Sequence, residues 1–275
     1  KKVKILMENE IIHLKDRSVI SIQGEDSEEF LQSIVTCNLD LQDQNYLSGA
    51  LLSPQGKLMN NFIVFKKDHK FLIDVHKGST EEFLKKLSIY KLKSKIQIEE
   101  ENELSVFVSL EKPYKDFQLD PRNKELGWRG ITKIKNISSE TMKKYEKKRL
   151  SLGIVEEGKD IKSGDYFPIE MNLDYCNSID FFKGCFIGQE VTSRMQRRGK
   201  VKKRVFPFRA ENTLTNQDDI IFIEKKVGTV IKAIDDIGIA LVRIEVIEDL
   251  ISQSEKIIIG NSPCKIEFFY PQGYS

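Results

Sequence analysis

The sequence predicts an α+β fold followed by a small all-β domain, and three observations support this prediction. Strand and helix patterns alternate in the first half, turns separate several of the strands, and short β-branched runs dominate after Val205. The length of 275 residues, with 40% hydrophobic and 31% charged residues, is enough for two folded domains. The composition therefore excludes a disordered or collagen-like chain.

The first half of the chain contains two predicted helices between strands. Each helix is preceded by a capping-box pattern, in which an Asp or Ser is followed three residues later by Glu. The predicted segments are a strand at 19–22, a helix opened by Asp26 and Glu29, strands at 47–52, 58–65 and 71–75, a helix opened by Ser79 and Glu82, and a strand at 95–98. This order favours ferredoxin-like packing of helices on one sheet face.

The second half of the chain changes in character. A looser stretch leads to a predicted helix over 139–152, whose lysines favour a solvated face. The predicted strands of the tail are 220–223, 227–231, 239–242, 256–259 and 264–269. We expect a small β-barrel and place the boundary near 203–206, which gives an α+β region over 1–203 and a barrel domain over 204–275.

The sequence lacks the residues that several classes of protein function require. No apolar run approaches the roughly 20 residues of a membrane span, and the N-terminus lacks the apolar core of a leader, so we expect a cytoplasmic protein without membrane contact. The four cysteines, Cys37, Cys176, Cys185 and Cys264, form no C-x-x-C pair, and the three histidines are far apart. We therefore expect free thiols and no metal site. Phosphate-binding glycine loops and a G-x-S-x-G elbow are also missing.

Positive charge is concentrated between residues 183 and 209. Nine basic residues stand there against one acid, so this segment carries 9 − 1 = +8 while the whole chain carries +2. A strip of this kind attracts anionic ligands, although a solvated connector explains it equally well. The alternative function is an RNA-binding module that grips tRNA phosphates with the strip at 194–209; the strip has no aromatic residue before Phe206, which disfavours base stacking.

Cys185 lies within this basic segment. Lys183 precedes it, Arg194 follows it, and Gly184 gives little steric cover, so the surroundings favour a thiolate. A reactive cysteine is one reading, and a small buried hydrophobic residue is the other.

The octet at 183–190, K-G-C-F-I-G-Q-E, resembles the signature of the YgfZ family. These are folate-binding proteins related to the T-protein (aminomethyltransferase) of the glycine cleavage system. Weaker matches extend over residues 17–208 and include G-E-D-S at 24–27, D-P-R at 120–122 and G-W-R at 127–129. The resemblance implies an aminomethyltransferase-like (GcvT-like) α+β fold, with two ferredoxin-like portions and a C-terminal barrel around a cavity for tetrahydrofolate.

The resemblance also implies a role and a set of residues. The role is that of an accessory protein for assembly, maintenance or repair of iron–sulfur enzymes, which indirectly supports tRNA thiolation. Its partners are folate, iron–sulfur enzymes or assembly proteins, and possible tRNA. Cys185, with Lys183, is the expected redox or transfer centre. The expected folate contacts or supports of the motif are Tyr145, Arg17, Asn61, Arg149, Glu170, Gln189, Glu190 and Arg194.

Aminomethyltransferase activity is disfavoured. Relatives with that activity have an aspartate in the strand where this chain has Asn60 and Asn61, and a glutamate where it has Ile131. An amide cannot take up a proton as a carboxylate does, so the general base is missing. We therefore predict no catalytic activity of a known type.

Overall fold

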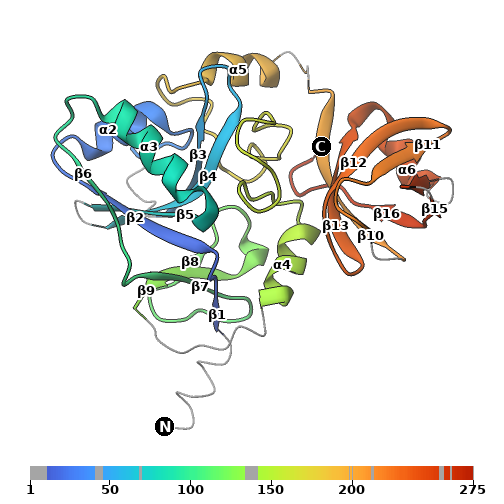
Figure 1. The fold of residues 1–275 in the computed structure, drawn as a ribbon, viewed down its shortest axis with the longest axis horizontal. Helices are drawn as coiled ribbons and strands as arrows, with labels where there is room; N and C mark the ends of the chain where they lie inside the picture. Colours follow the sequence, from blue (N-terminus) through green and yellow to red (C-terminus); the bar gives the residue numbers. More distant parts are fainter. Residues whose placement is uncertain are drawn as a thin grey trace, which may run out of the picture.

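The structure is a computed structural model that describes residues 11–40, 46–67, 70–133, 142–197, 199, 201–211, 214–253, 257–260 and 262–274. Within these ranges the strands form sheets of five, four and seven strands. Figure 1 shows the two smaller sheets on one side and the seven-stranded sheet on the other, with α4 (Met142–Ser151) between them. Among the described helices, none is long and apolar enough to cross a membrane.

The five-stranded sheet is antiparallel and carries two helices on one face. Its elements are β2 (Arg17–Gln23), α2 (Ser27–Ile34), β3 (Tyr46–Leu52), β4 (Leu58–Lys67), β5 (Lys70–His76), η1 (Lys77–Ser79), α3 (Thr80–Lys91) and β6 (Gln97–Glu100). The strand order is β3-β4-β5-β2-β6. Phe30 of α2 and Phe83 of α3 pack in one core with Ile20, Phe62 and Ile73 of the sheet. Both helices therefore cover the same face, as the sequence predicts.

The side chains of the two predicted capping boxes bond elsewhere. Asp26 is the N-cap residue of α2, but its carboxylate accepts the backbone N–H of Lys95 at 2.6 Å. Ser79 is the N-cap residue of α3, and its hydroxyl donates to Glu157 at 3.1 Å. The helices begin where the pattern places them, while the capping side chains tie them to distant segments.

The four-stranded sheet consists of β1 (Ile11–His13), β7 (Ser105–Ser109), β8 (Gln118–Leu119) and β9 (Trp128–Thr132), in the order β1-β7-β9-β8, with η2 at Lys124–Leu126. Val106 and Val108 of β7 share a core with Val19 of β2 and Tyr145 of α4. This core joins the two smaller sheets to α4. Of the predicted helix at 139–152, residues 139–141 lie outside the described residues, and α4 ends at Ser151, one residue before the predicted end.

The C-terminal sheet has the order β15-β14-β11-β12-β13-β10-β16. Its elements are β10 (Lys203–Ala210), β11 (Asp219–Phe222), β12 (Lys225–Ile234), β13 (Ile237–Arg243), η3 (Ile244–Val246), α6 (Ile247–Ser252), β14 (Ile257–Ile259), β15 (Ser262–Pro263) and β16 (Ile266–Phe268). A further core joins Leu52 and Leu58 of the first sheet to Val205 and Ile239 of this one. The domain boundary at 203–204 stays a prediction.

Candidate functional site

The loop that carries Cys185 is anchored by Lys183. The ammonium group of Lys183 donates to the backbone carbonyls of Gln32, Val35 and Cys37, each at 2.8 Å. These carbonyls lie at and just beyond the C-terminus of α2, where backbone acceptors lack helical partners. Burial lowers the pKa of Lys183 to about 8, although the nearby Cys37, Asp180 and Asp40 favour the charged form.

Asp180 fixes the other side of the loop. Its carboxylate accepts the backbone N–H groups of Phe182 at 2.7 Å and Lys183 at 3.1 Å, and its own N–H donates to the Thr36 carbonyl at 2.9 Å. Phe182 is 100% exposed at this turn. The turn therefore holds an apolar side chain in water through hydrogen bonds made by its backbone.

Cys185 lies between two buried neighbours and is itself exposed. Lys183 and Phe186 are each 7% exposed, whereas a Cβ built on Gly184 would meet nothing within 4 Å. After Phe186 the loop docks on the β3–β4 turn at Gly188, whose φ of +80° suits glycine. The chain therefore projects residues 184 and 185 into solvent between two inward anchors.

Helix α5 (Gln189–Arg197) follows the loop, and two of its charged side chains pair with each other. Arg194 pairs with Glu190 at 2.5 Å on an exposed face. Gln189 donates to the Lys183 carbonyl at 3.5 Å, a long contact, and its role as a support of the motif stays a prediction. The structure commits the Lys183 ammonium group to three carbonyls and pairs Arg194 with Glu190, and the expected activation of Cys185 by these two cations stays a prediction.

The other three thiols are buried. Burial raises the pKa of Cys37 and of Cys176 to about 12, so both stay protonated near neutral pH. No group of three or more His, Cys, Asp or Glu residues able to hold a metal ion occurs in the described ranges. Of the four thiols, Cys185 is therefore the one exposed to solvent.

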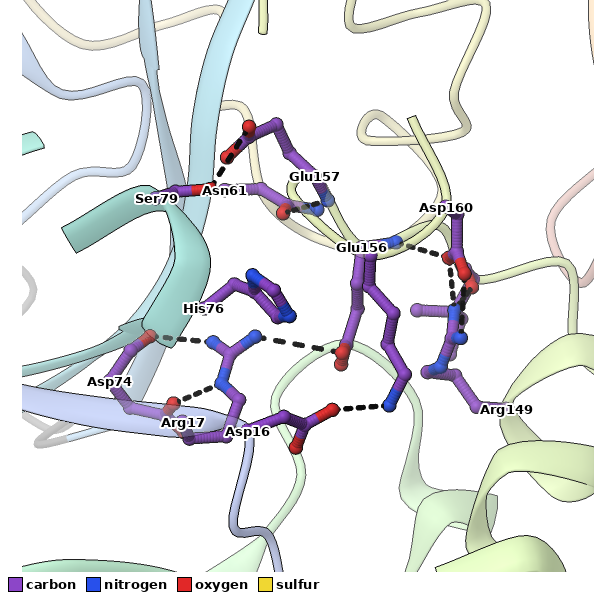
Figure 2. A network of polar contacts seen from close by, with 12 residues as sticks. Asp16, Arg17, Asn61, Asp74, His76, Ser79, Arg149, Glu156, Glu157 and Asp160 are labelled. Atoms are coloured by element: carbon purple, nitrogen blue, oxygen red, sulfur yellow. Dashed lines mark hydrogen bonds and ion pairs between the residues drawn. The ribbon is translucent and has the colours of Figure 1, made fainter. Parts of the chain in front are cut away.

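Three of the residues predicted to contact folate, Arg17, Tyr145 and Arg149, belong to a buried ionic network, part of which is drawn in Figure 2. Arg17 donates to Asp74 at 2.5 Å, and Arg129 pairs with the same carboxylate at 2.6 Å. The hydroxyl of Tyr145 accepts from Arg122 and Arg129, each at 2.9 Å. The side chains of Arg17 and Tyr145 are therefore buried, and their polar groups bond to other groups of the protein.

Arg149 belongs to the same network. It pairs with Asp160 at 2.6 Å and with Glu146 at 2.8 Å, and its side chain is fully buried. Burial opposes ionisation of the neighbouring Glu156, but the surrounding guanidinium groups outweigh it and hold the pKa of Glu156 well below its usual range. The observed arrangement of Arg17, Tyr145 and Arg149 thus does not fit the predicted folate contacts, because their polar groups hold the protein together.

Asn61 and Glu170 also make internal bonds. Asn61 donates to the Val155 carbonyl at 2.7 Å and accepts the Glu157 N–H at 2.9 Å. Glu170 accepts the backbone N–H of Phe167 at 2.9 Å. Neither contact requires a ligand, so both residues serve to order the 155–170 segment against β4.

Glu157 is a notable residue that the sequence reasoning missed. Its carboxylate accepts from the amide of Asn60 and the hydroxyl of Ser79, both at 3.1 Å, and Figure 2 places it beside Ser79 and Asn61. Burial raises the pKa of Glu157 to about 7. The sequence pattern does not indicate this raised pKa. Glu156 and Glu157 are adjacent in the sequence, but Glu156 lies among arginines whereas Glu157 accepts from neutral groups.

The basic strip is only partly a surface feature. Arg204 is 5% exposed, pairs with Asp174 at 2.8 Å and lies 4.2 Å over the ring of Tyr175. Lys202 and Lys203 are exposed, whereas Arg198 and Lys200 lie outside the described residues. Arg204 is therefore unsuited to the phosphate contact expected of it.

A cleft of about 720 Å³ adjoins the loop. Phe181 and Phe182 line it together with Leu119, Tyr46 and Ser48. Leu119 and Phe182 are both exposed, so the rim of this cleft is apolar beside the Cys185 loop.

Comparison with known proteins agrees with this architecture. Residues 202–268 match the model of the CAF17 C-terminal β-barrel domain. The fold resembles the crystal structure of the glycine cleavage system aminomethyltransferase T from Bartonella henselae, with a TM-score of 0.71 over 98% of this chain and 90% of that one. The sequence identity is 12%, so this likeness concerns the fold alone. The predicted aminomethyltransferase-like fold with a C-terminal barrel is confirmed.

Several proteins that match this chain in sequence are named as the mitochondrial iron–sulfur cluster assembly factor IBA57 or as a homolog of it. The Pyricularia oryzae protein is 27% identical over 86% of this chain and 72% of its own length. The Neurospora crassa protein is 30% identical over 70% of this chain and 52% of its own, and the human protein 27% identical over 71% and 65%. The chain thus spans about half to three quarters of these relatives.

Two predictions change with these comparisons. The expected cytoplasmic location is wrong, because the matched relatives are named as mitochondrial proteins. The relatives also carry the name IBA57 rather than YgfZ, while the broader expectation of iron–sulfur assembly proteins with this fold agrees with them. The chain is therefore similar along most of its length to the IBA57 proteins, with the fold of an aminomethyltransferase and a C-terminal barrel of the CAF17 type.

Proposed function

We propose that this chain is an accessory factor for the assembly, maintenance or repair of iron–sulfur enzymes, and that Cys185 is its point of contact with the cluster. The observation that carries the proposal is the exposed thiol on an anchored loop, in a chain similar to assembly factors named IBA57. The names of those relatives, which include the word mitochondrial, support a mitochondrial location for the proposed role.

The chemistry at Cys185 is ligand exchange, with the cluster as cargo. The Cys185 thiol loses its proton and its sulfur bonds to one iron, while a thiolate of the partner leaves that iron and takes up a proton. The cluster is neither oxidised nor reduced. Because stable ligation usually needs four thiolates and the other cysteines are buried, the partner supplies the remaining ligands.

Charge around the loop favours a thiolate-ligated cluster, which is anionic. Arg197 of α5 is exposed and lines a hollow with Phe181, just before the loop, and Lys202 and Lys203 are exposed farther along the chain. Such side chains speed the approach of an anionic partner without binding the cluster themselves.

Anaerobic reconstitution with ferrous iron, sulfide and glutathione tests the proposal, because glutathione provides the thiolates that this chain lacks. The wild type is expected to gain the visible absorption of a bound cluster, and Cys185→Ser to lose it. Cys264→Ser, a buried thiol in the barrel, is the matched control and should behave as the wild type. Equal cluster formation by Cys185→Ser and the control would refute the role of Cys185.

Folate and tRNA stay predictions. Anaerobic calorimetric titration with tetrahydrofolate tests the first, and it includes Cys185→Ser, which should bind as the wild type does if folate and thiol act separately. Support of tRNA thiolation would follow indirectly from cluster supply to the thiolating enzymes. A salt-dependent RNA shift assay tests the alternative of direct binding, because phosphate contacts weaken steeply as salt rises.

A further inference from the structure

The three hydrogen bonds of Lys183 match its chemistry closely. An ammonium group has three N–H donors on one atom, and three backbone carbonyls converge on the Lys183 nitrogen at 2.8 Å each. Two of the carbonyls come from the last turn and the C-cap of α2, and the third from Cys37. A cation at a helix C-terminus also interacts favourably with the helix dipole.

The same residue fixes the loop through its backbone. The N–H of Lys183 donates to the Asp180 carboxylate, and Asp180 is bonded in turn to Thr36. Lys183 therefore joins the end of α2 to the loop by both its main chain and its side chain. Phe186 enters the core three residues later, and this leaves the short span with Cys185 exposed.

We propose that Lys183 is a positioning residue that clamps the Cys185 loop to the C-terminus of α2. This inference rests on the proposed function, since the clamp matters because it presents Cys185 in one place to a partner. All three of its donors bond to carbonyls on the inner side of the loop, so none of them is left to bond the Cys185 thiol.

Arginine is not expected to replace the clamp. Its guanidinium spreads its donors over a planar fork, whereas the three carbonyls face one nitrogen atom. Methionine keeps the approximate length and apolar stem of lysine and removes every donor. These two substitutions separate the loss of charge from the loss of geometry.

Hydrogen exchange and thiol alkylation together test the inference. In Lys183→Met, exchange in peptides over 35–40 and 180–186 should rise about tenfold, while iodoacetamide alkylation of Cys185 should change by less than about twofold because the thiol is already exposed. Lys202→Met, which removes an exposed lysine, is the matched control. An activating role predicts the reverse pattern, with exchange unchanged and alkylation slowed about tenfold, and that result would overturn the clamp.

A second variant and a second readout keep the test decisive. If Lys183→Met shows no cooperative melting, Lys183→Arg is used; it should also raise exchange in both segments, and exchange equal to the wild type would count against the clamp. Cluster formation with glutathione should fall in these variants although Cys185 is present. If the wild type itself forms no cluster, the proposed function fails, while exchange and alkylation still decide the role of Lys183.

Discussion

Replacing Glu157 by glutamine should make the protein more stable, by an amount that grows with pH. The carboxylate is buried and accepts from two neutral donors, Asn60 and Ser79. Burial therefore dominates and raises the pKa of Glu157 from 4.5 to about 7. The folded state then binds more protons than the unfolded state between these values, so stability falls as pH rises through this window.

The magnitude follows from the same two pKa values. Their difference, multiplied by about 1.4 kcal/mol per pH unit, gives about 3 kcal/mol of lost stability at pH 8, and partial screening by water reduces this to about 2 kcal/mol. Glutamine stays neutral at every pH, and its amide oxygen can keep the bond from Ser79. Its amide nitrogen cannot accept from Asn60, but it can donate to the Asn60 amide oxygen, which has no hydrogen-bond partner in the structure, when the Asn60 amide turns over. The variant therefore removes the ionisation penalty at the expense of at most one local bond.

Urea unfolding of the wild type and Glu157→Gln at pH 5, 6, 7 and 8 measures this effect. The stability difference in favour of the variant should be under about 1 kcal/mol at pH 5 and about 2 kcal/mol or more at pH 8. Titration of all other groups cancels in the comparison. A difference that stays constant from pH 5 to pH 8 would mean that Glu157 is ionised with an ordinary pKa, and the reasoning from burial would be refuted.

Four further outcomes are expected. Asp74→Asn leaves two buried guanidinium groups without their shared carboxylate and should lower the free energy of unfolding by about 3 to 5 kcal/mol in urea titrations. Gly188→Ala places a Cβ 2.7 Å from the Ser53 carbonyl at a φ of +80°, and the same titration should report a loss of about 2 kcal/mol. Phe182→Ser should change stability by less than about 0.5 kcal/mol, because that ring is fully exposed. Disulfide-exchange titration should find one fast thiol, Cys185, in the folded protein and four in denaturant.

The alternating strands and helices could be predicted because their signals are local. Apolar residues at helical spacing in α2 face the sheet core, and short β-branched runs mark most barrel strands. Boundaries were less accurate, since the strand expected at 95–98 is β6 at Gln97–Glu100. Its start is displaced because the N–H of Lys95 bonds to Asp26 instead of entering the sheet. A tertiary bond of this kind leaves no mark in a local pattern.

The buried ionic network could not be predicted for the same reason. Arg17 and Asp74 are far apart in the sequence and meet when β2 pairs with β5, and Arg129 of β9 reaches the same carboxylate only when the two smaller sheets pack together. A single arginine in an amphipathic pattern is usually a solvent-exposed charge. The sequence identified Arg17 and Tyr145 through a family resemblance, but their charge partners, which decide what they do, lie on other elements.

Lys183 illustrates how a short motif can be located in the sequence while the fold decides the partners of its residues. Lys183 and Cys185 are close in the sequence, and the basic segment around them predicts that this lysine lowers the pKa of the Cys185 thiol. The loop turns the lysine inward, where unpaired carbonyls at the end of α2 satisfy an ammonium group better than a solvent-exposed thiol does. Arg204 is a second example, since its guanidinium group forms an ion pair with Asp174. The formal charge of the segment therefore overstates its surface charge, and the local excess of carbonyl and carboxylate acceptors determines which cations remain for a partner.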